Sequence, residues 1–124
     1  LRKNAGAVAA GRCEVRQGDV SRLPNADASF DLVTAFETVY FWPDVSAAFA
    51  EVFRVLGPSG VFLIVNEESG DSRWCSIVDG MRTYTADALA EWLCAVGFVD
   101  VRSDVRAEGG ALCLVARKGP DSVA

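Results

Sequence analysis

The stretch Phe30-Asp-Leu-Val-Thr-Ala-Phe36 is an almost uninterrupted apolar run, and Val61-Phe-Leu-Ile-Val-Asn-Glu67 is a second one. Between them, in Asp44–Leu56, apolar residues recur at every third or fourth position. Near-continuous apolar runs predict strands that are buried on both faces, as in a parallel sheet covered by helices. A strand, an amphipathic helix and a strand in this order predict a right-handed βαβ unit, so we expect an α/β fold.

The predicted helix after Asp44 has clear start and stop signals. Asp44 is a natural N-cap, because its carboxylate can accept a hydrogen bond from an unpaired amide of the first turn. We expect Gly57 to adopt the left-handed backbone conformation that ends many helices, and Pro58 to prevent continuation. A second amphipathic helix is predicted to begin after Thr85 and to end at Gly97.

The remaining segments complete a single domain. Further strands are predicted at Cys13–Gln17, Phe98–Val105 and 111–116, the last two joined by a hairpin turn at 108–110. Glu68–Tyr84 is expected to be a long loop. We assign residues 1–118 to one domain and 119–124 to a tail, and we expect the chain to be frayed from Lys118 onward.

Composition limits the classes of function. The 124 residues, of which 51% are hydrophobic, favour one packed domain. A net charge of −5 without a basic stripe argues against nucleic-acid binding, and no apolar run approaches the ~20 residues of a membrane span. The chain has no histidine, which excludes a Ser–His–Asp triad. Cys13, Cys75, Cys94 and Cys113 form no CxxC pair, so we expect no metal site and a reduced, cytoplasmic protein.

Acidic residues follow three of the predicted strands, at the edge where open α/β sheets bind ligands. They are Asp19, Glu37 and the pair Glu67-Glu68. Carboxylates at this edge suit a ligand with amine donors or a cationic centre, and they do not suit a phosphate group. For any single acid, an ordinary polar loop is the better explanation. Acids after three strands at one edge favour a binding site.

The order and spacing of these segments resemble the class I S-adenosylmethionine-dependent methyltransferases of the small-molecule type. The resemblance is carried by Gly18-Asp19-Val20, Leu23-Pro24, the strand ending in Phe36-Glu37, and Glu51–Gly60. The second helix and the terminal strand pair are similar to the last helix and the antiparallel hairpin of that family. The resemblance implies a Rossmann-like methyltransferase sheet that lacks the first two strands and has a C-terminal antiparallel hairpin.

The same resemblance implies S-adenosylmethionine as the cofactor and suggests which residues bind it. Asp19 matches the acid that accepts a hydrogen bond from the adenine amino group, and Val20 matches the residue that flanks the adenine. Phe36 and Glu37 match the strand end that lies beside the methionine part of the cofactor. No catalytic residue is assigned, although Glu37 or Glu67 could serve as a general base.

On the substrate side, the resemblance implies a wall made by Tyr40, Phe41 and Trp42. Core packing between helix and loop explains these aromatic residues equally well. Arg54 and the Pro58–Gly60 turn match positions with structural roles. Within that turn, serine stands where the family commonly has a second glycine, which is tolerable if the backbone there does not need a positive φ.

The glycine-rich loop of the family has no counterpart, since no Gly-x-Gly occurs in this sequence. The first strand of the family and the acid after its second strand are also absent, so we expect weak cofactor binding, or none, by this chain alone. Without those strands, Phe30–Phe36 becomes an exposed apolar edge. Either Cys13–Gln17 pairs with it directly, or a second chain covers it. We expect a homodimer or an exchange of edge strands.

Two functions stay open at this point. One is methyl transfer to a small molecule, and the other is a non-catalytic remnant of the fold that dimerises or binds a ligand. A third interpretation, a dehydrogenase, is disfavoured by the absent dinucleotide-binding fingerprint and by the terminal hairpin.

Overall fold

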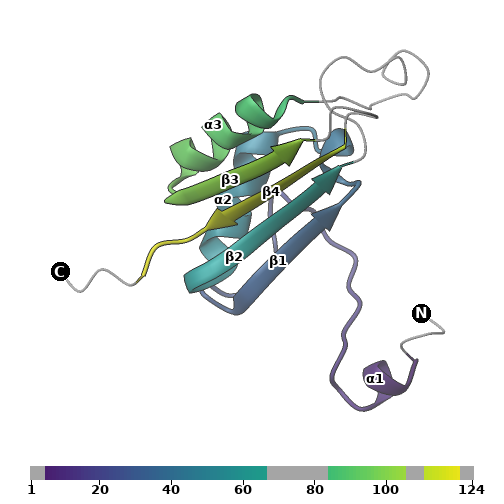
Figure 1. The fold of residues 1–124 in the computed structure, drawn as a ribbon. Helices are drawn as coiled ribbons and strands as arrows, with labels where there is room; N and C mark the ends of the chain where they lie inside the picture. The colour runs from purple at the N-terminus through teal and green to yellow at the C-terminus, as the bar shows by residue number, and fades with distance from the viewer. Residues whose placement is uncertain (1–4, 67–83, 106–110, 121–124) are drawn as a thin grey trace.

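The computed structural model, which describes residues 5–66, 84–105 and 111–120, contains a four-stranded mixed sheet in the order β1-β2-β4-β3 (Figure 1). The strands are β1 (Phe30–Phe36), β2 (Leu56–Asn66), β3 (Asp100–Val105) and β4 (Leu112–Arg117). β1 and β2 are parallel, whereas β4 is antiparallel to both β2 and β3. The predicted parallel pair and the C-terminal antiparallel hairpin are therefore confirmed.

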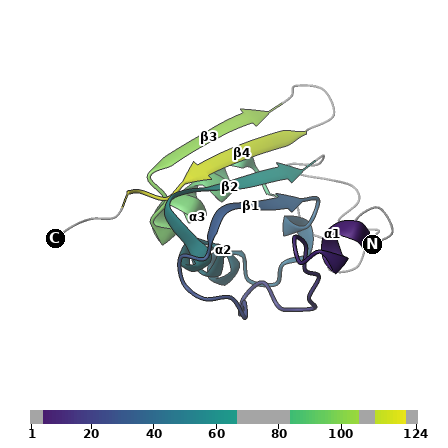
Figure 2. The ribbon, with the colours of Figure 1, turned by 90° about the horizontal axis from the view of Figure 1, so that it is seen from below.

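Two helices cover one face of this sheet. The helical elements are α1 (Ala5–Ala9), the 3-10 helix η2 (Val39–Phe41), α2 (Val45–Val55) and α3 (Ala86–Val96). α2 and α3 lie on the same side of the sheet, behind it in Figure 1 and beneath it in Figure 2. α1 lies apart from the sheet (Figure 1). No described helix is long and apolar enough to cross a membrane.

The predicted starts of both long helices are confirmed. The Asp44 carboxylate accepts a hydrogen bond from the Ala47 N–H at 3.0 Å, and the Thr85 hydroxyl accepts one from the Ala88 N–H at 3.1 Å. α3 ends as expected at Gly97. Its φ of +128° is a backbone conformation that glycine adopts without steric strain.

The end of α2 differs from the prediction. Leu56 is already extended, and the chain passes directly from α2 into β2 without a left-handed Gly57. The left-handed residue is instead Ser59, at φ +63°. Its N–H donates to the Gly119 carbonyl at 3.1 Å, so the C-terminal segment helps to fix this turn. At this turn, the register in which β2 pairs with β1 shifts.

The expectation that β1 is buried on both faces is wrong. Of its residues only Ala35 is buried, while Leu32 and Phe36 are 56% and 55% exposed. The described helices cover only one face, so the side chains that alternate toward the other face are not fully covered. The open face of the sheet is formed on β1, β2 and β4 by Leu32, Thr34, Phe36, Val61, Leu63, Val65, Cys113 and Val115, and on β3 it carries Arg102 and Asp104.

The predicted strand at Cys13–Gln17 is also wrong. Residues 13–18 have no regular secondary structure, and Val15 is 62% exposed. A strand is stable only when a neighbouring strand satisfies its N–H and C=O groups. In the part of the chain that the structure describes, this segment does not pair with β1, so one outer edge of the sheet is formed by β1.

A single hydrophobic core lies between the helices and the covered face of the sheet. Ring contacts run through it, with Phe49 against Phe62 at 5.6 Å between centroids and Phe53 against Phe98 at 5.1 Å. The buried members are Ala35, Val39, Val45, Phe49, Val52, Leu56, Phe62, Ile64, Leu89, Leu93, Phe98, Leu112, Leu114 and Ala116.

Lys118 does not belong to a frayed end. Its ammonium donates to the carbonyls of Phe53 and Leu56 at 2.8 and 2.7 Å, and its backbone N–H donates to Gly60 at 2.9 Å. The expected loop after β2, except for Tyr84, and the hairpin turn at 108–110 lie outside the described residues.

Candidate functional site

The parallel strands β1 and β2 end side by side, as the sequence predicts. Phe36 is paired with Val65, and the Glu37 N–H donates to the Val65 carbonyl at 2.9 Å. Asn66, the last residue of β2, is 1% exposed, and its side-chain oxygen has no hydrogen-bond partner among the described residues. Phe36, Glu37 and the buried side-chain amide of Asn66 therefore lie at this edge. Glu67, the other candidate base, lies outside the described part of the chain.

Glu37 holds an unusual backbone conformation at this edge. Its φ is +58°, in the left-handed region that costs a non-glycine residue about 1–2 kcal/mol. Such residues are uncommon and are found preferentially at functional sites. The conformation turns the chain sharply from the end of β1 into η2.

The three aromatic residues after β1 divide between the core and the surface. Tyr40 is buried, and its ring meets that of Phe41 edge-on at 6.2 Å between centroids. Trp42 packs against Phe49 of the core at 6.1 Å. Phe41 is 51% exposed. Tyr40 and Trp42 thus have packing contacts that explain them, whereas Phe41 is the one that offers its ring to solvent.

Asp19 and Val20 lie in a tight turn of the loop between α1 and β1. The Asp19 carbonyl accepts from the Arg22 N–H, and its Oδ1 accepts from the Ser21 N–H, both at 2.9 Å. Among the described residues, these bonds leave the second carboxylate oxygen of Asp19 available as an acceptor. The side chain of Val20 is half-buried.

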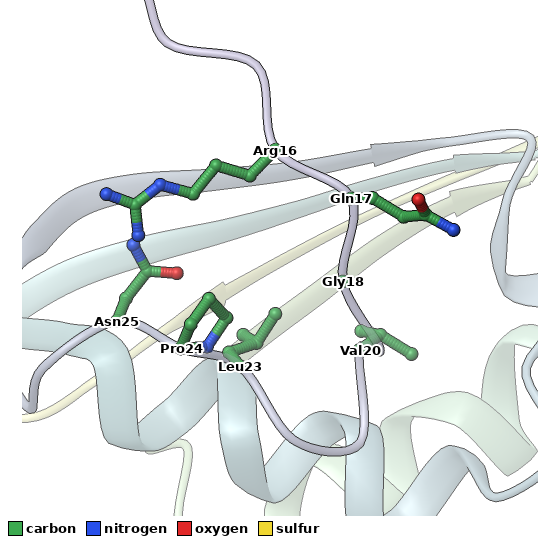
Figure 3. Close-up of a pocket in the computed structure, with 7 residues that line it drawn as sticks. All are labelled: Arg16, Gln17, Gly18, Val20, Leu23, Pro24 and Asn25. Carbon is green, nitrogen blue, oxygen red and sulfur yellow. The ribbon is translucent and has the colours of Figure 1, made fainter.

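This loop borders an open pocket of about 220 Å³ (Figure 3). Arg16 and Gln17 stand on one arm of the loop, and the chain returns past Leu23, Pro24 and Asn25 on the other. The lining residues are Arg16, Gln17, Gly18, Val20, Leu23, Pro24 and Asn25. The apolar part of this lining suits a flat ring, and the amide and guanidinium groups can hydrogen-bond its edge.

Of this lining, Val20 is a predicted cofactor residue, whereas Arg16, Gln17 and Asn25 are not predicted from the sequence. Leu23-Pro24 was part of the motif that carried the resemblance, which could have singled out the return arm. Asp19 borders the pocket in sequence and does not line it.

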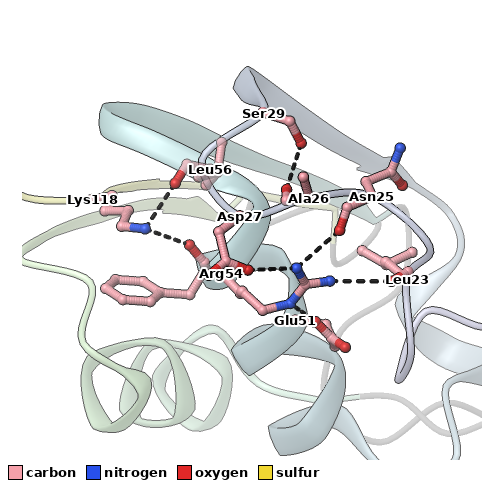
Figure 4. A network of polar contacts seen from close by, with 10 residues as sticks. Leu23, Asn25, Ala26, Asp27, Ser29, Glu51, Arg54, Leu56 and Lys118 are labelled. Atoms are coloured by element: carbon pink, nitrogen blue, oxygen red, sulfur yellow. Dashed lines mark hydrogen bonds and ion pairs between the residues drawn. The ribbon is translucent and has the colours of Figure 1, made fainter.

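Arg54, in the last turn of α2, connects the helix to this loop (Figure 4). Its Nη1 donates to the carboxylate of Asp27 at 2.7 Å, and its Nε donates to Glu51 at 2.5 Å. The hydrogen bond to Asp27, followed by the one to Glu51, raises the pKa of Arg54 above its ordinary value. The guanidinium carries its positive charge throughout the acid and neutral range, and its ion pairs require that the partner carboxylates are ionised.

The described residues offer groups that suit the two ends of S-adenosylmethionine. The loop pocket and the free oxygen of Asp19 suit the adenine ring with its amino group, and the Phe36-Glu37 edge can face the cationic methionine end. The sequence contains no Gly-x-Gly to approach the rest of the cofactor. Among the described residues, no group of three or more Cys, Asp or Glu side chains could hold a metal ion.

Comparisons with known proteins identify the family. Residues 1–64 match a family model described as a methyltransferase domain. A Mycolicibacterium smegmatis protein, named a probable S-adenosylmethionine-dependent methyltransferase, is 42% identical over 53 residues, which cover 43% of this chain and 21% of the relative. An O-methyltransferase of Pyrenophora dematioidea is 30% identical over 112 residues, which cover 80% of this chain and 42% of the relative.

The fold has a counterpart among solved structures. A Thermotoga maritima protein described as an S-adenosylmethionine-dependent methyltransferase superposes with a TM-score of 0.75 at 19% identity, covering 94% of this chain and 69% of that protein. The chain spans less than half the length of the two curated relatives above.

Proposed function

This chain belongs to the S-adenosylmethionine-dependent methyltransferases, and from that premise we propose that it binds S-adenosylmethionine and serves methyl transfer to a small molecule. The observation that carries the proposal is the partly apolar loop pocket, which is lined by both the residue before Asp19 and the residue after it. The adenine ring would lie against Val20, Leu23 and Pro24, and its amino group would donate to Asp19.

The methionine end of the cofactor would lie at the edge formed by Phe36 and Glu37. A carboxylate stabilises a nearby sulfonium, and the exposed Phe36 ring can contact it through its π face. The cofactor supplies the methyl group when it is bound. The protein would contribute mainly by holding that group in line with the acceptor atom of the substrate.

The substrate side of the site would be formed by Tyr40, Phe41 and Trp42. Phe41 is the residue for direct contact, because its ring is half exposed. Tyr40 and Trp42 would support it from within, because both are held by packing contacts.

A second candidate function is a non-catalytic module that dimerises or binds a ligand. The observation in its favour is the absence of any Gly-x-Gly from this sequence, because close approach of backbone to the cofactor needs such glycines. The two functions differ in one measurable property, which is the affinity for the cofactor.

We also propose that another chain covers the outer edge of β1, as a second copy or as a different polypeptide. Leu32 and Phe36 are more than half exposed there, and an apolar strand edge invites pairing. A cytoplasmic location accompanies this proposal, because the described cysteines Cys13, Cys94 and Cys113 are free thiols.

Titration of the full chain with S-adenosylmethionine by calorimetry tests the proposed function. Because the sequence has no Gly-x-Gly, we expect binding to be weak, with a dissociation constant just below the millimolar range. We expect Asp19→Asn to weaken it about tenfold, because an amide accepts more weakly than a carboxylate. Asp104→Asn is the matched control, since it removes the same charge from an exposed position on β3.

Each possible result has a definite meaning. No binding by the unaltered chain at millimolar cofactor would reject the proposal in favour of the non-catalytic module. Equal weakening by both variants would show that net charge, rather than Asp19 itself, governs affinity.

A further inference from the structure

The Arg54 side chain extends from α2 toward the loop that forms the pocket. Besides its ion pairs, its Nη1 donates to the Asn25 carbonyl at 2.9 Å and its Nη2 donates to the Leu23 carbonyl at 3.1 Å. These two acceptors flank Pro24, and all three residues line the pocket (Figures 3 and 4). One guanidinium therefore holds the whole return arm of the pocket.

Few other bonds fix this arm. The described part of the loop contains one isolated bridge, between Asp19 and Arg22, and does not pair with the sheet. Farther along, the N–H groups of Ala28 and Ser29 donate to the carbonyls of Arg54 and Val55 at 2.9 and 2.8 Å. Those bonds secure the chain where it enters β1. They lie beyond the pocket and leave the position of Leu23–Asn25 to the Arg54 side chain.

Arginine is suited to this task in a way that lysine is not. The planar guanidinium presents its N–H groups in a fixed fork, so that it can bind two carbonyls and two carboxylates at once. Glu51 pairs with the Nε of Arg54 at 2.5 Å and thereby orients the fork from within α2. The Arg54 side chain is one-third exposed and lies at the surface beside the loop.

We infer that Arg54 is the positioning residue of this pocket: it sets the distance between the two arms of the loop, and through it the affinity for the adenine end of the cofactor. It acts through the backbone of Leu23 and Asn25, and it is not among the residues that line the pocket. The part of this inference that concerns affinity rests on the proposed function. The part that concerns the loop does not.

Two measurements on Arg54→Lys in the full chain test the inference. Calorimetric titration with S-adenosylmethionine and with adenosine should show both affinities weakened by about the same factor, of the order of tenfold. Hydrogen exchange should show faster exchange at the amides of Ser21 and Arg22, with α3 unchanged. Arg102→Lys is the matched control, because Arg102 forms an exposed ion pair with Asp100 away from the pocket.

The outcomes separate the inference from the proposed function. If the unaltered chain binds and Arg54→Lys binds equally well, the inference is overturned and the proposed function stands. If the unaltered chain does not bind, the proposed function fails, and unchanged exchange at Ser21 and Arg22 would overturn the inference as well. Should Arg54→Lys fail to fold, Asp27→Asn removes an exposed member of the same network and should weaken binding in the same direction.

Discussion

Two residues with left-handed backbone mark opposite ends of the β1–β2 pair. Ser59 lies where β2 leaves its irregular first turn, and Glu37 lies where β1 ends. Neither conformation could be predicted from residue type, because both side chains disfavour a positive φ. Each is imposed by neighbours, since the N–H of Ser59 is bound by Gly119 and that of Glu37 by Val65.

At Ser59 we expect Ser59→Gly to raise the free energy of unfolding by about 1 kcal/mol, because glycine adopts a φ of +63° without strain. Urea denaturation measures the change. Ser59→Ala is the control, because it removes the hydroxyl and keeps the strain, so it should give no gain. A gain with alanine equal to that with glycine would contradict this explanation.

Lys118 gives a second prediction at this scale. Replacing it with methionine should lower the free energy of unfolding by about 1–2 kcal/mol, because two carbonyls at the end of α2 lose their charged donor. The ammonium also lies 4.5 Å from the centre of the Phe53 ring, a contact that is lost as well. Thermal unfolding followed by circular dichroism would report the loss.

The neighbouring Arg117→Met is the matched control, since Arg117 is exposed and the change should stay within about 0.5 kcal/mol. Equal effects of the two substitutions would mean that Lys118 does not anchor the C-terminal segment.

Among the elements, α2 contacts the core, the pocket loop and the C-terminal segment. Its apolar side packs in the core, its N-cap fixes the chain after η2, and its last turn holds both the pocket loop and Lys118. The spacing of apolar residues predicted this helix and its buried face. The polar contacts of its last turn could not be foreseen, because their partners are about 30 and 60 residues away in the sequence.

The N-cap of α2 can be tested separately from its core packing. Asp44→Ala should lower the free energy of unfolding by about 1 kcal/mol, because the amide of Ala47 loses its acceptor. Asp44→Asn keeps an acceptor at the same place and should be close to neutral. Chemical denaturation of the two variants decides the matter, and an asparagine variant as unstable as the alanine one would assign the effect to charge.

For the whole molecule, the open edge and the open face of the sheet are the dominant features. β1 has a neighbour on one side only among the described strands, and the open face is mainly apolar on β1 and β2. Relatives that match this chain are longer than it is, so a covering segment need not come from a second copy. Solubility and association state should therefore depend on this surface.

We expect the full chain to associate in a concentration-dependent manner, and Leu32→Lys to reduce that association, because a charge at the edge of β1 opposes strand pairing. Sedimentation velocity at several concentrations measures the effect. Val99→Lys introduces the same charge at a residue that is 68% exposed and distant in sequence from β1. A chain that stays monomeric at every concentration would contradict the proposed covering of the edge by a second copy.

The sequence by itself determined the local structure: the two parallel strands, the caps of α2 and α3, the terminal hairpin and the family. The strands, the caps and the hairpin depend on apolar spacing or on capping and turn residues within a few positions, so local physical preferences suffice for them, whereas the family follows from a resemblance of motifs. Only the tertiary structure decided that Cys13–Gln17 is not a strand, that β1 is exposed on one face, and that Arg54 holds the pocket loop. These outcomes depend on which distant segments are present as neighbours, because a strand needs a partner, a face needs a cover and a guanidinium needs its acceptors.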